Sequence, residues 1–176
     1  MEYKQLWVLI EGSDDTRFID KIIRPILINN YNSIKTWEYS KEPLQRKKKI
    51  LKSIAAIGDD YLFFSDINNS PCVSKKMDVL KSNFKKTVNS NNIVVVIKEI
   101  ESWYLAGLDN KKSKELSIKP LRNTNDITKE EFNRLIPKKF DSRIDFMVEI
   151  LKRFSVETAR RKNKSFNYLL TKIESL

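Results

Sequence analysis

The feature that most constrains the fold is a series of short apolar runs separated by segments with helical periodicity. Ile93–Ile97 consists entirely of β-branched residues, as is typical of a strand that is covered on both faces. Runs of similar length occur at Leu6–Ile10, Ile34–Tyr39 and Tyr61–Phe64. Strands that alternate with helices predict an α/β fold, with a parallel sheet of about four strands joined by right-handed crossovers.

The segments between these runs place apolar residues at helical spacing. We predict helices over Phe18–Leu27, where Pro25 should kink or end the helix, and over Val73–Phe84. A third helix should follow Pro43, with Leu44, Leu51, Ile54 and Ala55 facing inward and Arg46, Lys47, Lys48 and Lys49 facing outward. Each predicted helix would cover one face of the sheet.

The pattern changes after Lys98. Glu99–Leu105 has helical periodicity, residues 109–126 are polar and irregular, and three further helical stretches follow, of which Asp141–Phe154 is the clearest. We therefore predict an α/β core over residues 1–108 and a mostly helical C-terminal extension over residues 109–176.

The residue types that are absent or rare in the sequence exclude several kinds of catalytic and metal site. The 176 residues include no histidine, which excludes Ser-His-Asp and Cys-His nucleophiles and any histidine-ligated zinc. The single cysteine, Cys72, excludes an internal disulfide and suggests a reducing, cytoplasmic setting. The apolar runs are far too short to span a membrane. Catalysis would have to use carboxylates, Lys, Tyr or a cation with oxygen ligands, such as Mg²⁺ or Mn²⁺.

Two carboxylates follow apolar runs that should be neighbouring strands. Glu11 comes directly after the first run, and Ser65-Asp66 follows the third. Ligands of parallel sheets sit at the carboxyl ends of the strands, and two carboxylates about 4 Å apart repel by about 4 kcal/mol at an effective dielectric near 20. A divalent metal between them would relieve this repulsion. Asp15, one helical turn after Glu11, and Asn68 are further candidate ligands, although Asn68 also suits a turn, and Glu11 is the best candidate for proton transfer.

Lys98 and Glu101, which follow the fourth apolar run, are two more candidate site residues. Lys98 could stabilise phosphate charge at the carboxyl end of the strand, or could simply be exposed. Glu101 could be a metal ligand, or it could contact the ligands without binding the metal itself. The alternative interpretation is that Glu101 is a buried structural anchor.

The balance of charge favours a polyanionic partner. The net charge is +11 and the sequence pI is about 9.6. Two basic clusters are candidate contacts to nucleic acid, and Phe166 and Tyr168 near the second could stack on a base: Arg46, Lys47, Lys48 and Lys49, and then Arg160, Arg161, Lys162 and Lys164. Solvated helix faces, or the amino-acid bias of an AT-rich genome, would give the same composition.

These motifs together resemble the TOPRIM fold of topoisomerases, primases and OLD-type nucleases. The resemblance rests on Glu11-Gly12 after the first strand, Asp15 in the next helix, and Asp66-Ile67-Asn68 after the third strand. The segments Glu101–Leu105, Phe154–Arg161 and Ser165–Leu170 resemble small TOPRIM-like proteins and extend the similarity over nearly the whole chain.

The resemblance implies a Mg²⁺-dependent nuclease-like fold in a family with many members in phage defence or DNA repair. One position departs from the pattern, because the family's second Asp of the Asp-x-Asp motif is Asn68 here. That change removes one ligand charge, for which Asp59, Asp60 or Glu101 could compensate.

Three functions remain open. The first is a metal-dependent nuclease acting on DNA or RNA. The second is a nucleic-acid-binding module whose metal site has decayed, and the third is a subunit that works beside an ATPase partner. An enzyme acting on a small phosphorylated metabolite has less support, because the sequence contains no glycine-rich phosphate loop.

Overall fold

The chain forms two compact units in a computed structural model that describes residues 3–85 and 87–175. The first unit is Met1–Val95 and the second is Val96–Leu176. The division falls earlier than the change of character near Leu108, because the helix after the last strand packs against helices of the second unit. Each unit is described by itself.

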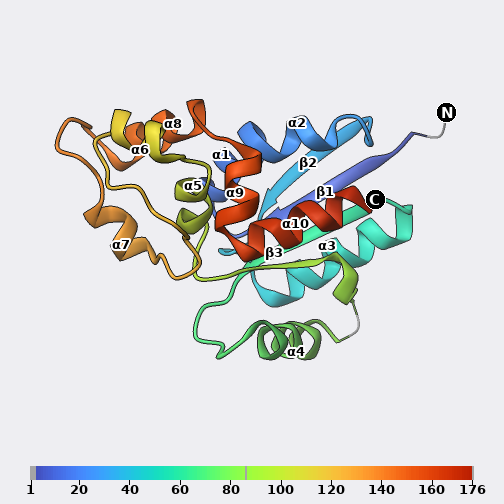
Figure 1. Ribbon diagram of the computed structural model, residues 1–176. Helices are drawn as coiled ribbons and strands as arrows, with labels where there is room; N and C mark the ends of the chain where they lie inside the picture. The colour runs from blue at the N-terminus through green and yellow to red at the C-terminus, as the bar shows by residue number, and fades with distance from the viewer. Residues whose placement is uncertain (1–2, 86, 176) are drawn as a thin grey trace. The chain divides into compact units, whose positions relative to one another are not determined.

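The sheet contains four strands in the order β2-β1-β3-β4, of which Figure 1 labels β1, β2 and β3. The strands are β1 (Gln5–Ile10), β2 (Ser33–Glu38), β3 (Asp60–Asp66) and β4 (Ile93–Val96). β1 pairs in parallel with both neighbours, with Leu9 opposite Trp37 on one side and Phe63 on the other. The predicted parallel α/β sheet is confirmed, and the first and third strands are neighbours.

The helices of the first unit connect successive strands. They are α1 (Ser13–Phe18), α2 (Arg24–Leu27), α3 (Leu44–Ile57) and α4 (Val73–Phe84). A π-helical turn, η1 (Ile19–Ile23), joins α1 to α2, and Arg24 N donates to Ile19 O there. Pro25 has no amide hydrogen, but it lies in the first turn of α2, where none is needed. The helix therefore continues through Pro25 instead of ending there. A short 3₁₀ turn, η2 (Ser90–Asn92), precedes β4.

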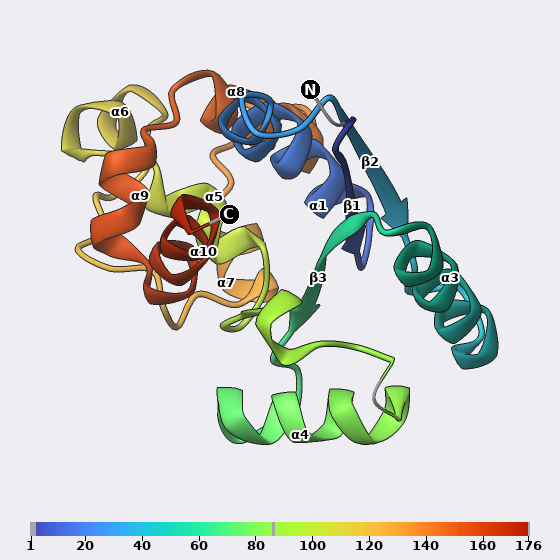
Figure 2. The ribbon, with the colours of Figure 1, turned by 90° about the vertical axis from the view of Figure 1, so that its right-hand side faces the viewer.

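Alternate strand residues build the core beneath α3 and α4. Leu9, Tyr39, Phe63 and Val95 share one buried cluster, together with the α3 residues Leu51 and Ile54 and the α4 residues Leu80 and Phe84. Figure 2 shows α3 on one side of β1–β3 and α1 on the other. The predicted inward face of α3 is right for Leu51 and Ile54 and wrong for Leu44 and Ala55, which are exposed.

Gly58 ends α3 in the left-handed conformation, with φ 76°, and its amide donates to Ala55 O. This conformation favours glycine, because a side chain there would be strained. The chain can therefore leave α3 and enter β3 directly.

The second unit is helical. It contains α5 (Glu101–Ala106), α6 (Asn110–Glu115), α7 (Lys129–Arg134), α8 (Arg143–Lys152), α9 (Val156–Lys162) and α10 (Lys164–Glu174). Its core is aromatic, and Trp103 packs edge-on against Phe166 while Phe132 packs against Phe146. The predicted inward face of Asp141–Phe154 includes Met147 and Ile150, whereas Ile144 is exposed. Within the described residues, no helix is both long and apolar enough to cross a membrane.

Candidate functional site

Three strands of the first unit end at one edge of the sheet, and their last residues form the candidate site. Glu11 follows β1, Tyr39 follows β2, and Ser65 and Asp66 end β3. Tyr39 N donates to Ile10 O at 2.9 Å, which fixes the end of β2 beside the end of β1. We call this edge, with Glu11, Tyr39, Ser65 and Asp66, the carboxyl rim.

The Glu11 carboxylate is held by neutral donors. Its Oε1 accepts hydrogen bonds from Ser65 Oγ at 3.0 Å and from the backbone amide of Asp66 at 3.0 Å. Tyr39 Oη lies 3.4 Å from the same oxygen, and its hydroxyl also donates to Phe64 O at 2.6 Å. In residues 3–85 and 87–175, every hydrogen bond to the Glu11 side chain goes to Oε1, and no Lys or Arg forms an ion pair with it. The protein thus orients the carboxylate without neutralising its charge.

The raised pKa of the Tyr39 hydroxyl indicates that negative charge is concentrated at the carboxyl rim. Burial raises the pKa of the Tyr39 hydroxyl well above its ordinary value, Glu11 raises this pKa further, and Asp66 and Asp15 add smaller contributions. Tyr39 is therefore a protonated, neutral donor at any physiological pH. The same three acids would attract a cation.

Asp15 is buried at the start of α1, close to the rim. Its Oδ2 accepts a hydrogen bond from Gly12 N at 3.0 Å and so closes the first turn of the helix. At least one of its oxygens thus has a structural role. The predicted role of Asp15 as a metal ligand stays a prediction.

Asn68 lies in an exposed turn after β3. Its φ is 49°, a left-handed value that Asn tolerates better than most residues, and Ser70 N donates to Ile67 O across the turn. This geometry accounts for the residue type in terms of the backbone alone. Its predicted contact with a metal likewise stays a prediction.

The rim opens into a cavity of about 250 Å³ in the first unit. Its polar lining includes Glu11, Tyr39, Ser65 and, from α3, Lys47. Lys47 Nζ lies over the Tyr39 ring, 5.0 Å from its centroid. An apolar surface completes the lining: Leu44, Phe63, Leu80 and Phe84. A carboxylate and an ammonium group therefore share one small cavity.

The four basic residues predicted to face outward on α3 do not behave alike. Lys47 faces the cavity at the rim, whereas Lys48 and Lys49 line a separate hollow of about 450 Å³ on α3. Arg46 pairs with Glu42 at 2.9 Å. Their predicted contact with nucleic acid is untested, but the structure separates Lys47 from the other three.

The donor set at the rim suits a hard divalent cation. Glu11 and Asp66 supply two carboxylates, and Mg²⁺ in proteins is often held by one or two carboxylates with water and substrate phosphate filling the other positions. No group of three or more His, Cys, Asp or Glu side chains in the described part of the chain is arranged to hold a metal. A metal at this rim would accordingly be held by Glu11 and Asp66 and would keep several positions open.

Two other predicted site residues belong to the second unit. Lys98 is exposed and has a left-handed φ of 63°. Glu101 is buried and forms an ion pair with Arg143, whose guanidinium stacks over the Phe132 ring at 5.6 Å. Burial raises the pKa of the Glu101 carboxyl above its usual value, while Arg143 acts in the opposite direction. The geometry seen for Glu101 is that of a structural anchor, the alternative interpretation of this residue.

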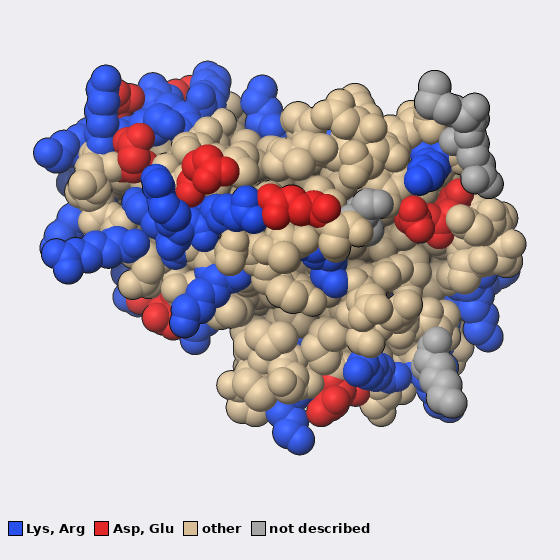
Figure 3. All heavy atoms as spheres, turned by 45° about the vertical axis from the view of Figure 1, so that its right-hand side comes forward, with Lys and Arg blue, Asp and Glu red and all other residues tan. Residues whose placement is uncertain are grey.

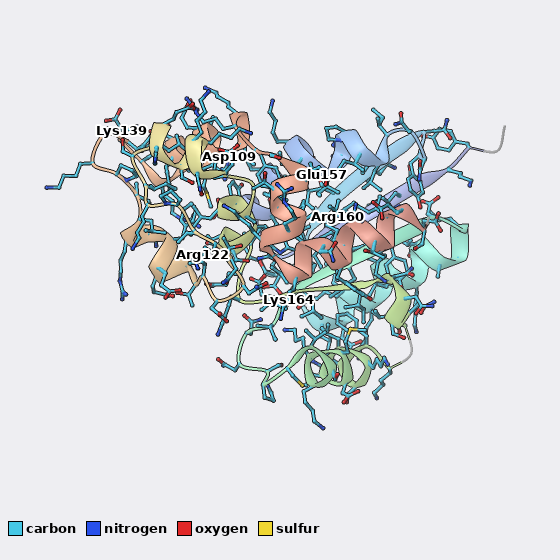
Figure 4. All side chains as sticks on the ribbon, in the orientation of Figure 1. Asp109, Arg122, Lys139, Glu157, Arg160 and Lys164 are labelled. Atoms are coloured by element: carbon cyan, nitrogen blue, oxygen red, sulfur yellow. The ribbon has the colours of Figure 1, made fainter. Side chains whose placement is uncertain are left out.

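The second predicted basic cluster is partly occupied by contacts within the protein. Arg160, on α9 (Figure 4), binds both carboxylate oxygens of Glu174 at 2.7 Å. Lys162 Nζ donates to Leu108 O at 2.5 Å, and burial lowers its pKa. Arg161 and Lys164 are exposed. Figure 3 shows Lys and Arg side chains gathered toward the left of the view, with fewer Asp and Glu among them.

Sequence reasoning missed Tyr39 and Ser65 as site residues. Both could have been found from the rule that placed Glu11 and Asp66 together, because the carboxyl ends of adjacent parallel strands share an edge. Tyr39 follows the second strand, and Ser65 immediately precedes Asp66. The contact between Ser65 and Glu11 joins residues that are far apart in sequence and carries no local signal.

The comparisons with known proteins agree with this architecture. No protein-family model and no curated protein matches the sequence. Among solved structures, the C-terminal region of the OLD protein of Xanthomonas campestris pv. campestris is similar, with a TM-score of 0.50 and 12% sequence identity. The match covers 99% of this chain and 96% of that one. The chain has an OLD-related fold. At this identity the likeness concerns the fold alone, and it agrees with the resemblance drawn from the motifs.

Proposed function

We propose that the chain is a nuclease or related phosphodiester-processing enzyme that depends on Mg²⁺ or Mn²⁺ and acts on nucleic acid in the cytoplasm. The observation that supports the proposal most is the set of contacts made by the Glu11 carboxylate. Its carboxylate is fixed by Ser65 and by the backbone amide of a second acid, Asp66, and no Lys or Arg of the described residues forms an ion pair with it. Such an arrangement is suited to a divalent cation, which would neutralise phosphate charge during phosphodiester cleavage.

The residues of the chain then have distinct roles. Glu11 and Asp66 would hold the metal, with Asp15 and Asn68 as the further ligands that the sequence suggests. Glu11 is also the group best placed to move a proton at the scissile oxygen. Ser65 and Tyr39 position the Glu11 carboxylate, and Lys98 would stabilise phosphate charge.

Charge and fold support nucleic acid as the substrate. The net charge of +11 suits a polyanion, and the exposed Lys49, Arg161 and Lys164 offer contacts to phosphates. The motif resemblance and the OLD-related fold both point to nuclease chemistry, and we propose a role in phage defence or DNA repair beside a partner ATPase.

A cleavage assay with matched variants tests this function. Single- and double-stranded DNA and RNA would be incubated with Mg²⁺, with Mn²⁺ and with EDTA. We expect metal-dependent cleavage that is lost in Glu11→Gln and Asp66→Asn and kept in Asp78→Asn, a control at an exposed acid of α4. Cleavage that persists in Glu11→Gln would contradict the proposal.

One observation favours a second function, a nucleic-acid-binding module without turnover. Asn68 replaces the second acid of the motif and lies in a turn whose backbone suits Asn, and no third acid in the described residues completes a metal cluster. This alternative predicts salt-sensitive binding with no cleavage of any substrate in either metal.

A further inference from the structure

We propose that the cavity at the carboxyl rim binds a single phosphate group of the nucleic acid, and that Lys47 is its main contact. The inference rests on the proposed function in taking nucleic acid as the ligand, but it does not require cleavage. It assigns to Lys47 a role that the other basic residues of α3 do not share.

The position of Lys47 sets it apart from its neighbours. Only Lys47 among the four basic residues at 46–49 lines the cavity that contains Glu11, while Lys48 and Lys49 line a different hollow. The Lys47 ammonium lies over the Tyr39 ring at 5.0 Å, so the ring face holds the cation in place. Tyr39 in turn donates to Phe64 O at the end of β3. The cation is thus held near the residues that orient Glu11.

The rest of the lining has the chemistry that a phosphate needs. Ser40 and Asn83 line the same cavity, and their side chains are of a kind that can donate hydrogen bonds to phosphate oxygens. Leu44, Leu80 and Phe84 provide apolar walls, and a charge-assisted hydrogen bond is stronger where water is partly excluded. About 250 Å³ is enough space for a phosphate with part of its sugar.

The charges in this cavity predict how binding responds to Glu11. A phosphodiester in the cavity meets an attractive ammonium group and a repulsive carboxylate. When no divalent metal is present, Lys47 must offset the repulsion from Glu11 by itself. Metal-free affinity should therefore fall when the Lys47 charge is removed and rise when the Glu11 charge is removed.

The test is binding of a short, labelled single-stranded DNA, and of the matching RNA, by fluorescence anisotropy in EDTA. Lys47→Met keeps the aliphatic stem over Tyr39 and removes the charge, and it should weaken binding about tenfold. Lys47→Arg, which keeps the charge, should stay within about threefold of the parent protein. Lys48→Met is the matched control from the same helix, and it should weaken binding by no more than about threefold.

Glu11→Gln supplies an independent readout and should tighten metal-free binding several-fold. Equal losses in Lys47→Met and Lys48→Met, or an unchanged affinity in Glu11→Gln, would overturn the inference. If Lys47→Met does not fold, as judged by circular dichroism, Lys47→Arg and Glu11→Gln still decide the question. A protein that shows these binding changes but never cleaves DNA or RNA would refute the proposed enzyme and leave the phosphate site intact.

Discussion

The sequence predicts Glu11 and Glu101 as ligands of one metal site, but the two carboxylates have different kinds of partner in the two units of the molecule. Glu11, at the carboxyl rim, accepts hydrogen bonds from a serine hydroxyl and a backbone amide, with a tyrosine hydroxyl slightly farther away. Glu101, in the second unit, is buried against the guanidinium of Arg143. Both acids are positioned, but only Glu101 has its charge balanced by the protein.

The difference separates a carboxylate that has no ion-pair partner from one whose charge the protein balances. A buried charge needs a partner, and the partner of Glu101 is supplied by α8 of its own unit. Neutral donors orient Glu11 and leave its charge available to a cation from outside the protein. Sequence position alone does not distinguish the two acids. The partner that each acid has in the structure does distinguish them.

The largest expected effect is the loss of cleavage in Glu11→Gln. The amide can still accept from Ser65 and from the Asp66 amide, so the rim should keep its shape, and the unfolding free energy should change by less than about 1 kcal/mol. Activity should nevertheless fall by about 10³-fold, because charge and proton transfer are both lost. Single-turnover cleavage and urea unfolding of the same preparation check this. Equal damage to stability and activity would mean that the role of Glu11 is structural.

Arg143→Met should show the opposite behaviour. It leaves the Glu101 carboxylate buried without its counter-charge, and we expect a loss of about 3 kcal/mol in unfolding free energy. Metal-free binding of nucleic acid, scaled to the folded fraction, should be unchanged. Urea unfolding measures the first effect and anisotropy the second. A fully stable Arg143→Met protein would remove the contrast between the two acids.

Gly107→Ala tests how tightly the second unit is packed around the segment that carries Glu101. A β-carbon at Gly107 would lie 2.1 Å from a ring carbon of Phe154, so the ring would have to move and its contact with Phe166 would be disturbed. We expect a loss of about 2 kcal/mol. Gly58→Ala is the control in the first unit, where nothing crowds the β-carbon but φ is 76°, and it should lose about 1 kcal/mol. Thermal unfolding of both variants would reveal the order, and a larger loss at Gly58 would contradict it.

The smallest effect concerns pH. Burial raises the pKa of Glu101 in the folded protein above its ordinary value of 4.5. Its contribution to stability is therefore fully present below pH 4.5 and is lost as the pH rises through the raised pKa. Relative to Glu101→Gln, which cannot ionise, the parent protein should lose stability as the pH rises from below 4.5 toward neutrality. Urea unfolding of both proteins across this range would show the trend, and a difference independent of pH would contradict it.

Local patterns and the rules of parallel sheets make part of this structure predictable from the sequence. The apolar runs locate all four strands, and the strand ends bring Glu11 and Asp66 to one rim. Partners that lie far away in the chain are not predictable in this way. Glu101 meets Arg143, and Arg160 meets Glu174, through tertiary packing that leaves no periodic signal. The basic run on α3 likewise looks like one patch in the sequence. In the structure Lys47 and Lys48 line different hollows, because successive residues of a helix face different directions.

Direct titration with Mn²⁺, followed by calorimetry or by electron paramagnetic resonance, tests the central claim without relying on activity. The parent protein and Glu101→Gln should bind Mn²⁺ with the same affinity, while Glu11→Gln and Asp66→Asn should lose most of it. Binding that survives in Glu11→Gln, or that disappears in Glu101→Gln, would contradict the account of the carboxyl rim as the metal site.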